Sequence, residues 1–362
     1  MTTSTAIAAD YQKSLFVARD GVYDWLQLKV DTWKAHRWDA DVALAERVLF
    51  LTGERGVGKT WLLRHLATDD TQVSPLAAYL DLEERTRFSS AERYVEVMEE
   101  RVQQRLGSDG AILLLDAVPP QMDEKMRFLE DAVLRPYAAQ RHCLVVMALV
   151  HPSQVCWRTP AFQAGERWLV TPFEVAQTRK QLQQLDRAGL ATQQLKAAAV
   201  QESSGGLPLL NYLLVTRGRE EAFEALLEHS FSRVPADERE RVRTYLEAVC
   251  LLEVLEHTAI RKMVEIYISH RPEAMEYPVH PIGVLNLLRK HWLSQSAFDS
   301  PGRMVLIDSV RRAATELLKA RDGELYDKLE EAARVPSGLP DASYARLAQD
   351  RSQARQSQGR QK

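Results

Sequence analysis

Short apolar runs alternate with segments of helical spacing over residues 46–172. The runs predict strands, because each has strand length and is bounded by polar or glycine-rich residues. They cover residues 47–52, 77–82, 111–116, 143–150 and 168–170. Residues 61–67, 91–106 and 124–139 show the spacing of helices with one apolar face. This alternation indicates a parallel sheet covered by helices on both faces.

The pattern changes after residue 173, and only helices are expected up to about residue 227. The next part predicts helices near residues 237–256, 260–267 and 282–291, followed by strands at 292–297 and 304–308. An Asp-Ser-Pro-Gly turn signal separates these two strands. Three helices followed by a hairpin predict a winged-helix module. The tail from about Pro336 is rich in Gln, Ser and Arg, and we expect it to be disordered.

The composition is that of a globular protein, with 45% hydrophobic and 27% charged residues among 362. The formal net charge of −3 gives no support to a nucleic-acid or anionic-membrane partner. The longest apolar runs are too short to cross a bilayer, and the N-terminus shows no signal-peptide pattern. The three cysteines include no CxxC pair, which argues against a disulfide framework or a zinc site. We therefore expect a cytoplasmic protein without membrane contact.

Residues 53–60, Gly-Glu-Arg-Gly-Val-Gly-Lys-Thr, match the phosphate-binding loop pattern G-x-x-x-x-G-K-[ST] between a predicted strand and a predicted helix. The three glycines let the backbone aim several N–H groups at one anion. The start of the helix adds the positive end of its dipole. Lys59 supplies an ammonium for the β- and γ-phosphates, and Thr60 offers a hydroxyl to Mg²⁺. The sequence therefore predicts binding of ATP or ADP with Mg²⁺.

Asp116 ends the third apolar run, where an acid can hold Mg²⁺ through a bound water. In many ATPases of this class a second acid follows directly, but here that position is Ala117. Asp81 or Glu83, at the end of the second predicted strand, could orient the attacking water instead, and both are equally plausible as solvated loop acids. We therefore expect hydrolysis to be absent or slow, roughly 10⁻² s⁻¹ or below.

Three further segments accompany the phosphate loop. Residues 15–20 read Leu-Phe-Val-Ala-Arg-Asp, residues 169–173 read Leu-Val-Thr-Pro-Phe, and residues 206–209 read Gly-Leu-Pro-Leu. In this order, the four segments resemble those of the STAND class, the signal transduction ATPases with numerous domains. Residues 15–20 are similar to its Phe-Val-Gly-Arg-Glu motif, with Ala18 and Asp20 replacing Gly and Glu. Residues 169–173 are similar to its Leu-x-Pro-Phe segment after the last strand, and residues 206–209 match the Gly-x-Pro motif of its helical domain.

The resemblance covers nearly the whole chain and implies roles for single residues. Pro208 would lie against the nucleotide and lock the closed ADP form, and Arg19 would line the base pocket. The chain also departs from the family. A sensor arginine is expected after the fourth strand, where His151 stands closest and Arg158 lies further on. Ile307 replaces the histidine of the Met-His-Asp motif. The switch is therefore expected to be tuned differently or to be partly degenerate.

The expected fold class is α/β plus α, a parallel-sheet P-loop NTPase domain followed by a helical domain and a winged-helix domain. The expected boundaries are an N-terminal helical segment with the Phe-Val-Gly-Arg-Glu-like motif at 1–45, the NTPase domain at 46–172, the helical domain at 173–234, the winged helix at 235–335 and the tail at 336–362. The candidate nucleotide-binding residues are Arg19, Gly53, Glu54, Arg55, Gly56, Val57, Gly58, Lys59, Thr60, Trp61 and Pro208. Lys59 and Asp116 are the main catalytic candidates, Asp81 and Glu83 are the weaker ones, and Thr60 and Asp116 are the candidate Mg²⁺ ligands.

These features predict a STAND-type molecular switch. ADP would hold the domains closed, and exchange for ATP would open them for self-association or for signalling to a protein partner. The physical basis is that the γ-phosphate and Mg²⁺ favour one arrangement over the other. The compact form suggests a bacterial setting, for which conflict or defence signalling rests on the family resemblance alone.

Two rival functions remain open. One is a DNA-associated AAA-like ATPase, which shares the order of domains. Residues 235–330 carry fourteen Lys and Arg against sixteen Asp and Glu, and the presumed recognition helix at 282–291 offers only Arg289 and Lys290 beside His291. A DNA reader would normally show a basic stripe, so this rival is disfavoured. The other is a kinase-type enzyme, for which no acceptor site or catalytic base is apparent.

Overall fold

The computed structural model describes residues 11–36, 43–105, 111–119, 122–140, 143–150, 157–232, 234–273, 280–291, 293–296 and 302–334. The chain divides into two compact units, Met1–Leu226 and Leu227–Lys362. Three features predicted above lie wholly or largely outside the described residues: the tail from Pro336, the sensor position His151 and the Asp-Ser-Pro-Gly turn. Within the described ranges, no helix is long and apolar enough to span a bilayer.

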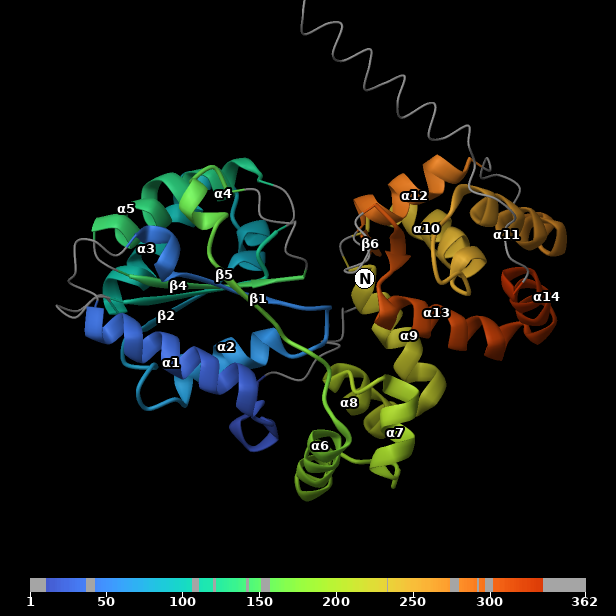
Figure 1. The fold of residues 1–362 in the computed structure, drawn as a ribbon, viewed down its shortest axis with the longest axis horizontal. Coiled ribbons are helices and arrows are strands. Elements are labelled where there is room, and N and C mark those ends of the chain that lie inside the picture. The colour runs from blue at the N-terminus through green and yellow to red at the C-terminus, as the bar shows by residue number, and fades with distance from the viewer. Residues whose placement is uncertain are drawn as a thin grey trace, which may run out of the picture. The chain divides into compact units, whose positions relative to one another are not determined.

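The first unit is built on a five-stranded sheet in which every neighbouring pair of strands is parallel (Figure 1). The strand order is β2 (Ala77–Asp81), β3 (Ile112–Asp116), β4 (Leu144–Leu149), β1 (Val48–Thr52) and β5 (Glu166–Leu169). This sheet confirms the α/β part of the prediction. The carboxyl ends of parallel strands lie along one edge, and ligands of such sheets bind there. The chain leaves β1 into the phosphate loop at this edge, and β3 ends there at Asp116.

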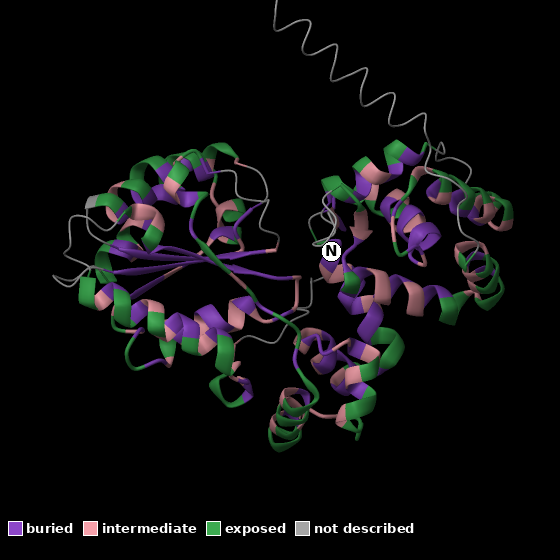
Figure 2. Cartoon of the chain, viewed as in Figure 1, coloured by how far each residue is buried: buried purple, intermediate pink, exposed green. Residues whose placement is uncertain are grey.

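Helices cover both faces of the sheet (Figure 1). One face carries α1 (Asp20–His36) and α2 (Lys59–Thr68). The other carries α3 (Ala91–Arg105), α4 (Glu124–Leu129), a π-helical turn (Glu130–Leu134) and α5 (Arg135–Gln140). The central strands β1, β3 and β4 are therefore buried on both faces, as Figure 2 shows. That double burial explains why their sequences are continuous apolar runs rather than alternating ones.

The remaining elements of the first unit are short turns and a group of helices. The 3₁₀ turns span Lys13–Leu15, Leu44–Arg47, Leu82–Arg87 and Pro160–Phe162. The helices are α6 (Val175–Arg187), α7 (Ala197–Ser204), α8 (Pro208–Arg217) and α9 (Arg219–Ser230), and α9 crosses the boundary between the units. Leu207–Pro208 begins α8 with the proline in the first turn, where its missing N–H is tolerated. This arrangement leaves the first turn of α8 available to contact the phosphate loop.

The second unit contains α10 (Ala236–Val249), α11 (His257–His270), α12 (Pro281–Lys290), α13 (Asp308–Arg321) and α14 (Gly323–Arg334). Between α12 and α13, β6 (Ser294–Ser296) and β7 (Met304–Leu306) pair antiparallel. Three helices followed by a hairpin are the elements that the sequence predicts here. The assignment to the winged-helix class, and the domain boundaries given above, stay predictions.

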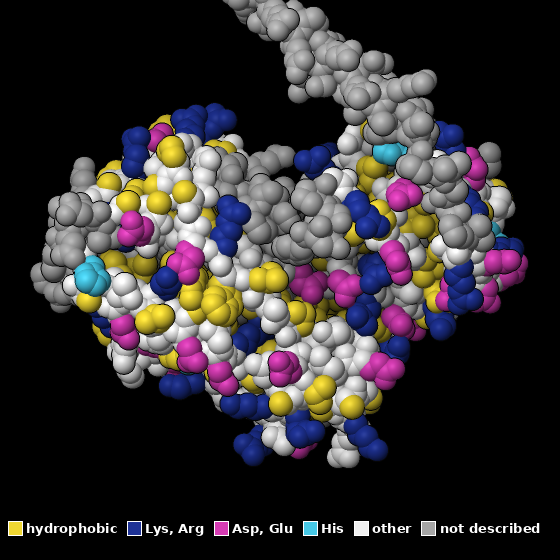
Figure 3. All heavy atoms as spheres, viewed as in Figure 1, with side chains coloured by type: hydrophobic (Ala, Val, Ile, Leu, Met, Phe, Trp, Pro, Cys, Tyr) yellow, Lys and Arg dark blue, Asp and Glu magenta, His cyan; other side chains and the backbone are white. Residues whose placement is uncertain are grey.

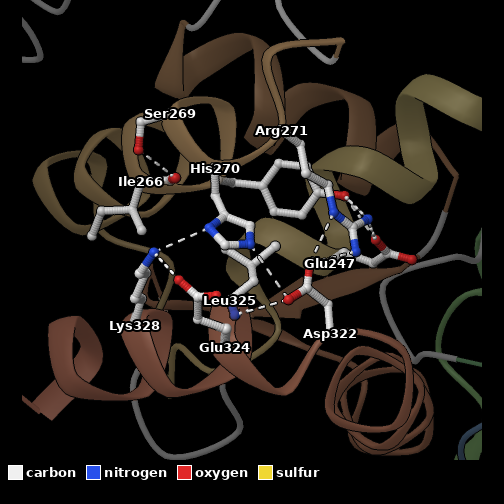
Figure 4. Close-up of polar contacts among 10 residues, drawn as sticks. Glu247, Ile266, Ser269, His270, Arg271, Asp322, Glu324, Leu325 and Lys328 are labelled. Atoms are coloured by element: carbon white, nitrogen blue, oxygen red, sulfur yellow. Dashed lines mark hydrogen bonds and ion pairs between the residues drawn. The ribbon is translucent and has the colours of Figure 1, made fainter.

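A polar network joins three helices and the α13–α14 junction of the second unit (Figure 4). Arg271, just after α11, donates from Nη2 to Asp322 Oδ2 at 3.0 Å, and its Nη1 lies 3.5 Å from Glu247 Oε2. His270 Nε2 lies 3.4 Å from Asp322 Oδ1, and Lys328 Nζ lies 3.2 Å from His270 Nδ1. Glu247 is buried, so Arg271 supplies the opposite charge that a buried carboxylate requires. The network is intramolecular and fixes how α11 meets α14.

Candidate nucleotide-binding site

The predicted phosphate loop links β1 to α2 at the carboxyl edge of the sheet. Gly58 is the N-cap of α2 and has φ +98°, and Gly56 has φ +81°. These left-handed conformations favour glycine because a Cβ would collide with the backbone. Leu62 N donates to Gly58 O at 3.1 Å, so the helix begins directly after the loop. The loop therefore faces the N-terminal end of a helix, which favours a bound anion.

Lys59 is folded back onto the phosphate loop. Its Nζ donates to Gly53 O at 2.6 Å and to Glu54 O at 2.9 Å, and the residue is 8% exposed. Burial lowers the pKa of Lys59 to about 7, although the carboxylates of Asp116 and Glu54 oppose that shift. The ammonium group thus rests on carbonyl oxygens at the mouth of the loop, from which a phosphate could draw it away.

Asp116 lies directly beside Thr60. The Thr60 hydroxyl donates to Asp116 Oδ1 at 3.1 Å, and the amide of Ala117 donates to the same oxygen at 2.8 Å. Ala117 has φ +52°, an uncommon conformation for a residue with a side chain. The Thr60 hydroxyl keeps its lone pairs for a cation while its hydrogen is bound to Asp116. Hydroxyl and carboxylate oxygens with phosphates and water make up the usual environment of Mg²⁺, so these residues fit that ion.

The described residues hold no group of three or more His, Cys, Asp or Glu side chains that could bind a metal ion by themselves. A cation at Thr60 and Asp116 would consequently need phosphate oxygens and water to complete its shell. This requirement ties the ion to a bound nucleotide.

The two weaker catalytic candidates differ in position. Asp81 pairs in register with Asp116 on the neighbouring strand, so both side chains leave the sheet on the same face. Asp81 Oδ1 accepts the amide of Glu83 at 3.0 Å. Burial raises the pKa of Asp81, and the nearby charge of Asp116 adds to that effect. Glu83 is exposed on the turn that follows. Of the two, only Asp81 shares the edge position of Asp116.

Arg19 lies across the phosphate loop. Its Nη2 donates to the carbonyl oxygen of Val57, and its guanidinium lies 4.6 Å from the centre of the Phe173 ring. Its Nη1 is buried and has no hydrogen-bond partner. Burial lowers the pKa of the guanidinium to about 10, so Arg19 stays charged at neutral pH. The base-pocket role that the resemblance implies stays a prediction, and the contact with Val57 shows a second role in holding the loop.

The Gly-Leu-Pro-Leu segment at residues 206–209, which follows the sheet in the sequence, also contacts the phosphate loop. Leu209 N donates to Gly56 O at 3.2 Å. Gly206 O accepts the amide of Phe173 at 2.8 Å, and a Cβ at Gly206 would lie 2.1 Å from Phe173 O. Pro208 itself stands in the first turn of α8, one residue before the contact. The structure thus brings the other three segments singled out in the sequence together around the phosphate loop.

The other candidate residues lie at different distances from this cluster. Glu54 and Arg55 are half-buried on the loop, and the ring of Trp61 packs edge-on against Tyr11, with 5.5 Å between the ring centres.

Two positions named above as departures from the family lie elsewhere. Arg158 forms an ion pair with Asp131 at 3.8 Å, on the face of the sheet that carries the π-helical turn. Ile307 is buried before α13 in the second unit. None of these contacts joins Arg158 to the loop.

Two residues of the site were missed by sequence reasoning. Tyr79, in the middle of β2, donates from its hydroxyl to Asp116 Oδ2 at 2.7 Å. Arg64, on α2, donates from Nε to the Tyr79 hydroxyl at 3.3 Å. Burial raises the pKa of Tyr79 far above its usual value, and the charge of Asp116 raises it further, so the phenol keeps its proton. Asp81 is the residue of β2 that pairs with Asp116, and Tyr79 stands two residues before it, on the same face of the sheet. This placement follows from the register of the two strands, and no local sequence motif indicates it.

The sequence matches no family model, and no curated protein is significantly similar to it. Among solved structures, the Walker-type ATPase PABY2304 of Pyrococcus abyssi superposes with a TM-score of 0.52 at 12% identity, over 85% of this chain and 99% of that one. Cdc6p from Pyrobaculum aerophilum superposes with a TM-score of 0.40 at 14% identity, over 85% of this chain and 98% of that one. The RuvB branch-migration motor of Thermotoga maritima superposes with a TM-score of 0.43 at 12% identity, over 81% of this chain and 93% of that one. The first of these likenesses shows that this chain shares the fold of that Walker-type ATPase.

Proposed function

We propose that this chain is a nucleotide-dependent molecular switch of the STAND type. It binds ATP or ADP with Mg²⁺ at the phosphate loop, and exchange of the nucleotide changes how the surrounding segments pack. Self-association or signalling to a protein partner is the output. The observation that carries this proposal is the hydrogen bond from Leu209 N to Gly56 O, because it attaches α8 to the loop that would hold the phosphates.

The contacts of the loop carbonyls provide the coupling. Val57 O is bound by Arg19 from the N-terminal side, and Gly56 O is bound by Leu209 from the C-terminal side. A ligand shifts a conformational equilibrium only by the difference in its interactions with the two states. A nucleotide that reorients the loop amides must also change the geometry of these two carbonyls, which belong to the same peptide units. Nucleotide occupancy is thereby linked to the position of α8.

Slow turnover fits a switch better than rapid hydrolysis does. The position after Asp116 is Ala117, which cannot act as a base. Asp81 is a second carboxylate on the same face of the sheet edge. With no acid directly after Asp116, we expect slow hydrolysis, and the bound nucleotide then persists long enough to define a state.

The first test is to denature freshly purified protein and identify the nucleotide that it releases. Lys59→Met is compared with Lys125→Met, because Lys125 Nζ also donates to two backbone carbonyls, at 3.0 and 2.6 Å, but belongs to α4. We expect stoichiometric ADP or ATP from the wild type and from Lys125→Met, and none from Lys59→Met. Equal release from all three proteins, or release from none with no binding of added nucleotide, would contradict the proposal.

The alternative is a DNA-associated AAA-like ATPase, for which the helices and hairpin of the second unit are the relevant observation. Lys290 Nζ lies 2.8 Å from Glu238 Oε1, and His291 Nε2 lies 2.6 Å from Glu238 Oε2. Basic and acidic side chains are interleaved on the face of this unit drawn in Figure 3. These pairings place a carboxylate beside Lys290 and His291, two of the three side chains named for the presumed recognition helix, and so weaken their attraction for phosphates. Binding to duplex DNA that weakens steeply with salt would favour the alternative.

A further inference from the structure

A chain of two hydrogen bonds runs from α2 through β2 to the end of β3. Arg64 Nε donates to the Tyr79 hydroxyl at 3.3 Å, and that hydroxyl donates to Asp116 Oδ2 at 2.7 Å. A guanidinium can only donate, so the single hydrogen of the phenol is available for the carboxylate. The direction of the chain is therefore fixed by chemistry rather than by a choice of rotamer.

Asp116 is consequently held through both of its oxygens. Oδ1 accepts from the Thr60 hydroxyl and from the amide of Ala117, and Oδ2 accepts from Tyr79. The residue is 4% exposed. With Oδ2 tied to the phenol, the carboxylate cannot rotate freely to bring both oxygens to one cation. The remaining acceptor capacity lies on the side of Thr60, where a metal-bound water would donate.

We propose that Tyr79, oriented by Arg64, is a positioning residue that fixes Asp116 as a water-mediated ligand of the nucleotide-bound Mg²⁺. This inference rests on the proposed function, because it concerns the Mg²⁺ that would bind together with the nucleotide. Groups that hydrogen-bond to metal-binding carboxylates set the orientation of those carboxylates, and their loss typically weakens metal binding about 10- to 100-fold. Tyr79 occupies that place for Asp116.

A purely structural role for Tyr79 makes a different prediction. If the phenol served only to satisfy a buried carboxylate, Tyr79→Phe would lower the thermal stability of the protein and leave its affinity for Mg²⁺ unchanged. A positioning role predicts weaker Mg²⁺ binding while the affinity for Mg²⁺-free ADP stays the same, because Asp116 would touch the ion's water and not the phosphates.

The chain offers a matched control in Tyr94 on α3. Its ring is fully buried in the same unit, and its hydroxyl has no hydrogen-bond partner. Tyr94→Phe therefore removes a buried phenolic oxygen without removing a contact. Comparing Tyr79→Phe with Tyr94→Phe separates the loss of the hydrogen bond to Asp116 from the general effect of deleting a hydroxyl group from the core.

The experiment titrates Mg²⁺ into the complex of full-length protein with N-methylanthraniloyl-ATP and measures ADP affinity separately in EDTA. We expect about tenfold weaker Mg²⁺ binding in Tyr79→Phe, no change in Tyr94→Phe, and the same ADP affinity for all three proteins in EDTA. Arg64→Met, which leaves the phenol in place but removes the guanidinium that donates to it, should weaken Mg²⁺ binding by a smaller factor.

The Asp116→Asn background decides whether Tyr79 acts through Asp116. In that background, Tyr79→Phe should produce no further loss of Mg²⁺ affinity, because the carboxylate that it orients is gone. If the losses of Mg²⁺ affinity in the two variants add fully, or if Tyr79→Phe binds Mg²⁺ normally while Asp116→Asn is impaired, the inference is wrong and the proposed function still stands. If the wild type binds no nucleotide with or without Mg²⁺, the proposed function fails and the inference fails with it.

Discussion

The backbone amide of Leu209 donates to the carbonyl oxygen of Gly56 at 3.2 Å, and this hydrogen bond joins the first turn of α8 to the phosphate loop. The approach is close enough to exclude a side chain at position 56. A Cβ there would lie 2.9 Å from the Cβ of Leu209. At Gly58 the nearest atom to a Cβ would be Nη2 of Arg19 at 3.5 Å, which is an ordinary contact.

Gly56→Ala should therefore destabilise the nucleotide-free protein more than Gly58→Ala does. Both substitutions place a Cβ on a residue with positive φ, which costs about 1–2 kcal/mol. Only the first also forces α8 away from the loop, and such overpacking adds about 1–3 kcal/mol. Urea denaturation of the two variants measures the difference. Equal losses in the free energy of unfolding at the two positions would show that α8 moves away from the loop at no energetic cost, so that its position does not depend on the loop.

Arg19→Ala should weaken ATP and GTP binding by similar factors, because Arg19 contacts the loop carbonyl of Val57 rather than a base-specific group. Without this contact the nucleotide must order the loop itself, and if the whole cost of the lost charge-assisted hydrogen bond, about 1.5–3 kcal/mol, falls on binding, affinity decreases about tenfold or more. Displacement of a fluorescent nucleotide by each competitor measures the two affinities. A large loss for ATP with GTP unaffected would support the base-pocket role that the family resemblance implies.

The location of the site was predictable because local patterns determine it. The spacing of Gly53, Gly58 and Lys59, and the placement of Asp116 after five buried apolar residues, encode the loop and the strand end within short windows of sequence. The supporting contacts were not predictable. Tyr79 reaches Asp116 through the pairing of two strands separated by more than thirty residues, and no periodicity specifies that register. The assignment of the second unit to the winged-helix class stays a prediction.

Binding of nucleotide should be coupled to proton uptake by Lys59. Burial lowers its pKa to about 7, whereas an ammonium paired with phosphates stays protonated. Above pH 7 the free protein has lost part of this proton, so affinity should fall as pH rises, approaching tenfold per unit. Calorimetry at pH 8 in buffers of different ionisation enthalpy measures the uptake. Lys59→Arg, which does not titrate in this range, should bind without it.

The lowered pKa of Lys59 also affects the free energy of unfolding, which should rise with pH while nucleotide affinity falls. Between pH 7 and the ordinary lysine pKa near 10.4, the unfolded chain binds more protons at Lys59 than the folded one does. The contribution of Lys59 to the free energy of unfolding should therefore increase with pH across this window and be constant below it. Comparing the pH dependence of denaturation midpoints for the wild type and Lys59→Met isolates this contribution. If the denaturation midpoints of the two proteins approach each other as pH rises, the result agrees with a buried lysine that deprotonates easily.

Residual ATP hydrolysis should depend on Asp81. Its Cβ lies on the same face of the sheet edge as that of Asp116, on a neighbouring strand about 5 Å away. Burial raises its pKa, which makes the carboxylate a better proton acceptor than an exposed acid. Asp81→Asn should lower single-turnover hydrolysis by about 100-fold with little change in nucleotide affinity, and Glu83→Gln should have little effect.

The pH profile distinguishes this role from simple electrostatics. A general base works in its deprotonated form, so the rate should rise with pH through the pKa of Asp81 and then level off. Asp81→Asn should remove that rise, because an amide does not titrate. If Asp81→Asn instead changed Mg²⁺ affinity and left the shape of the profile intact, its carboxylate would be acting on the cation. Any hydrolysis would then proceed without Asp81 as a general base.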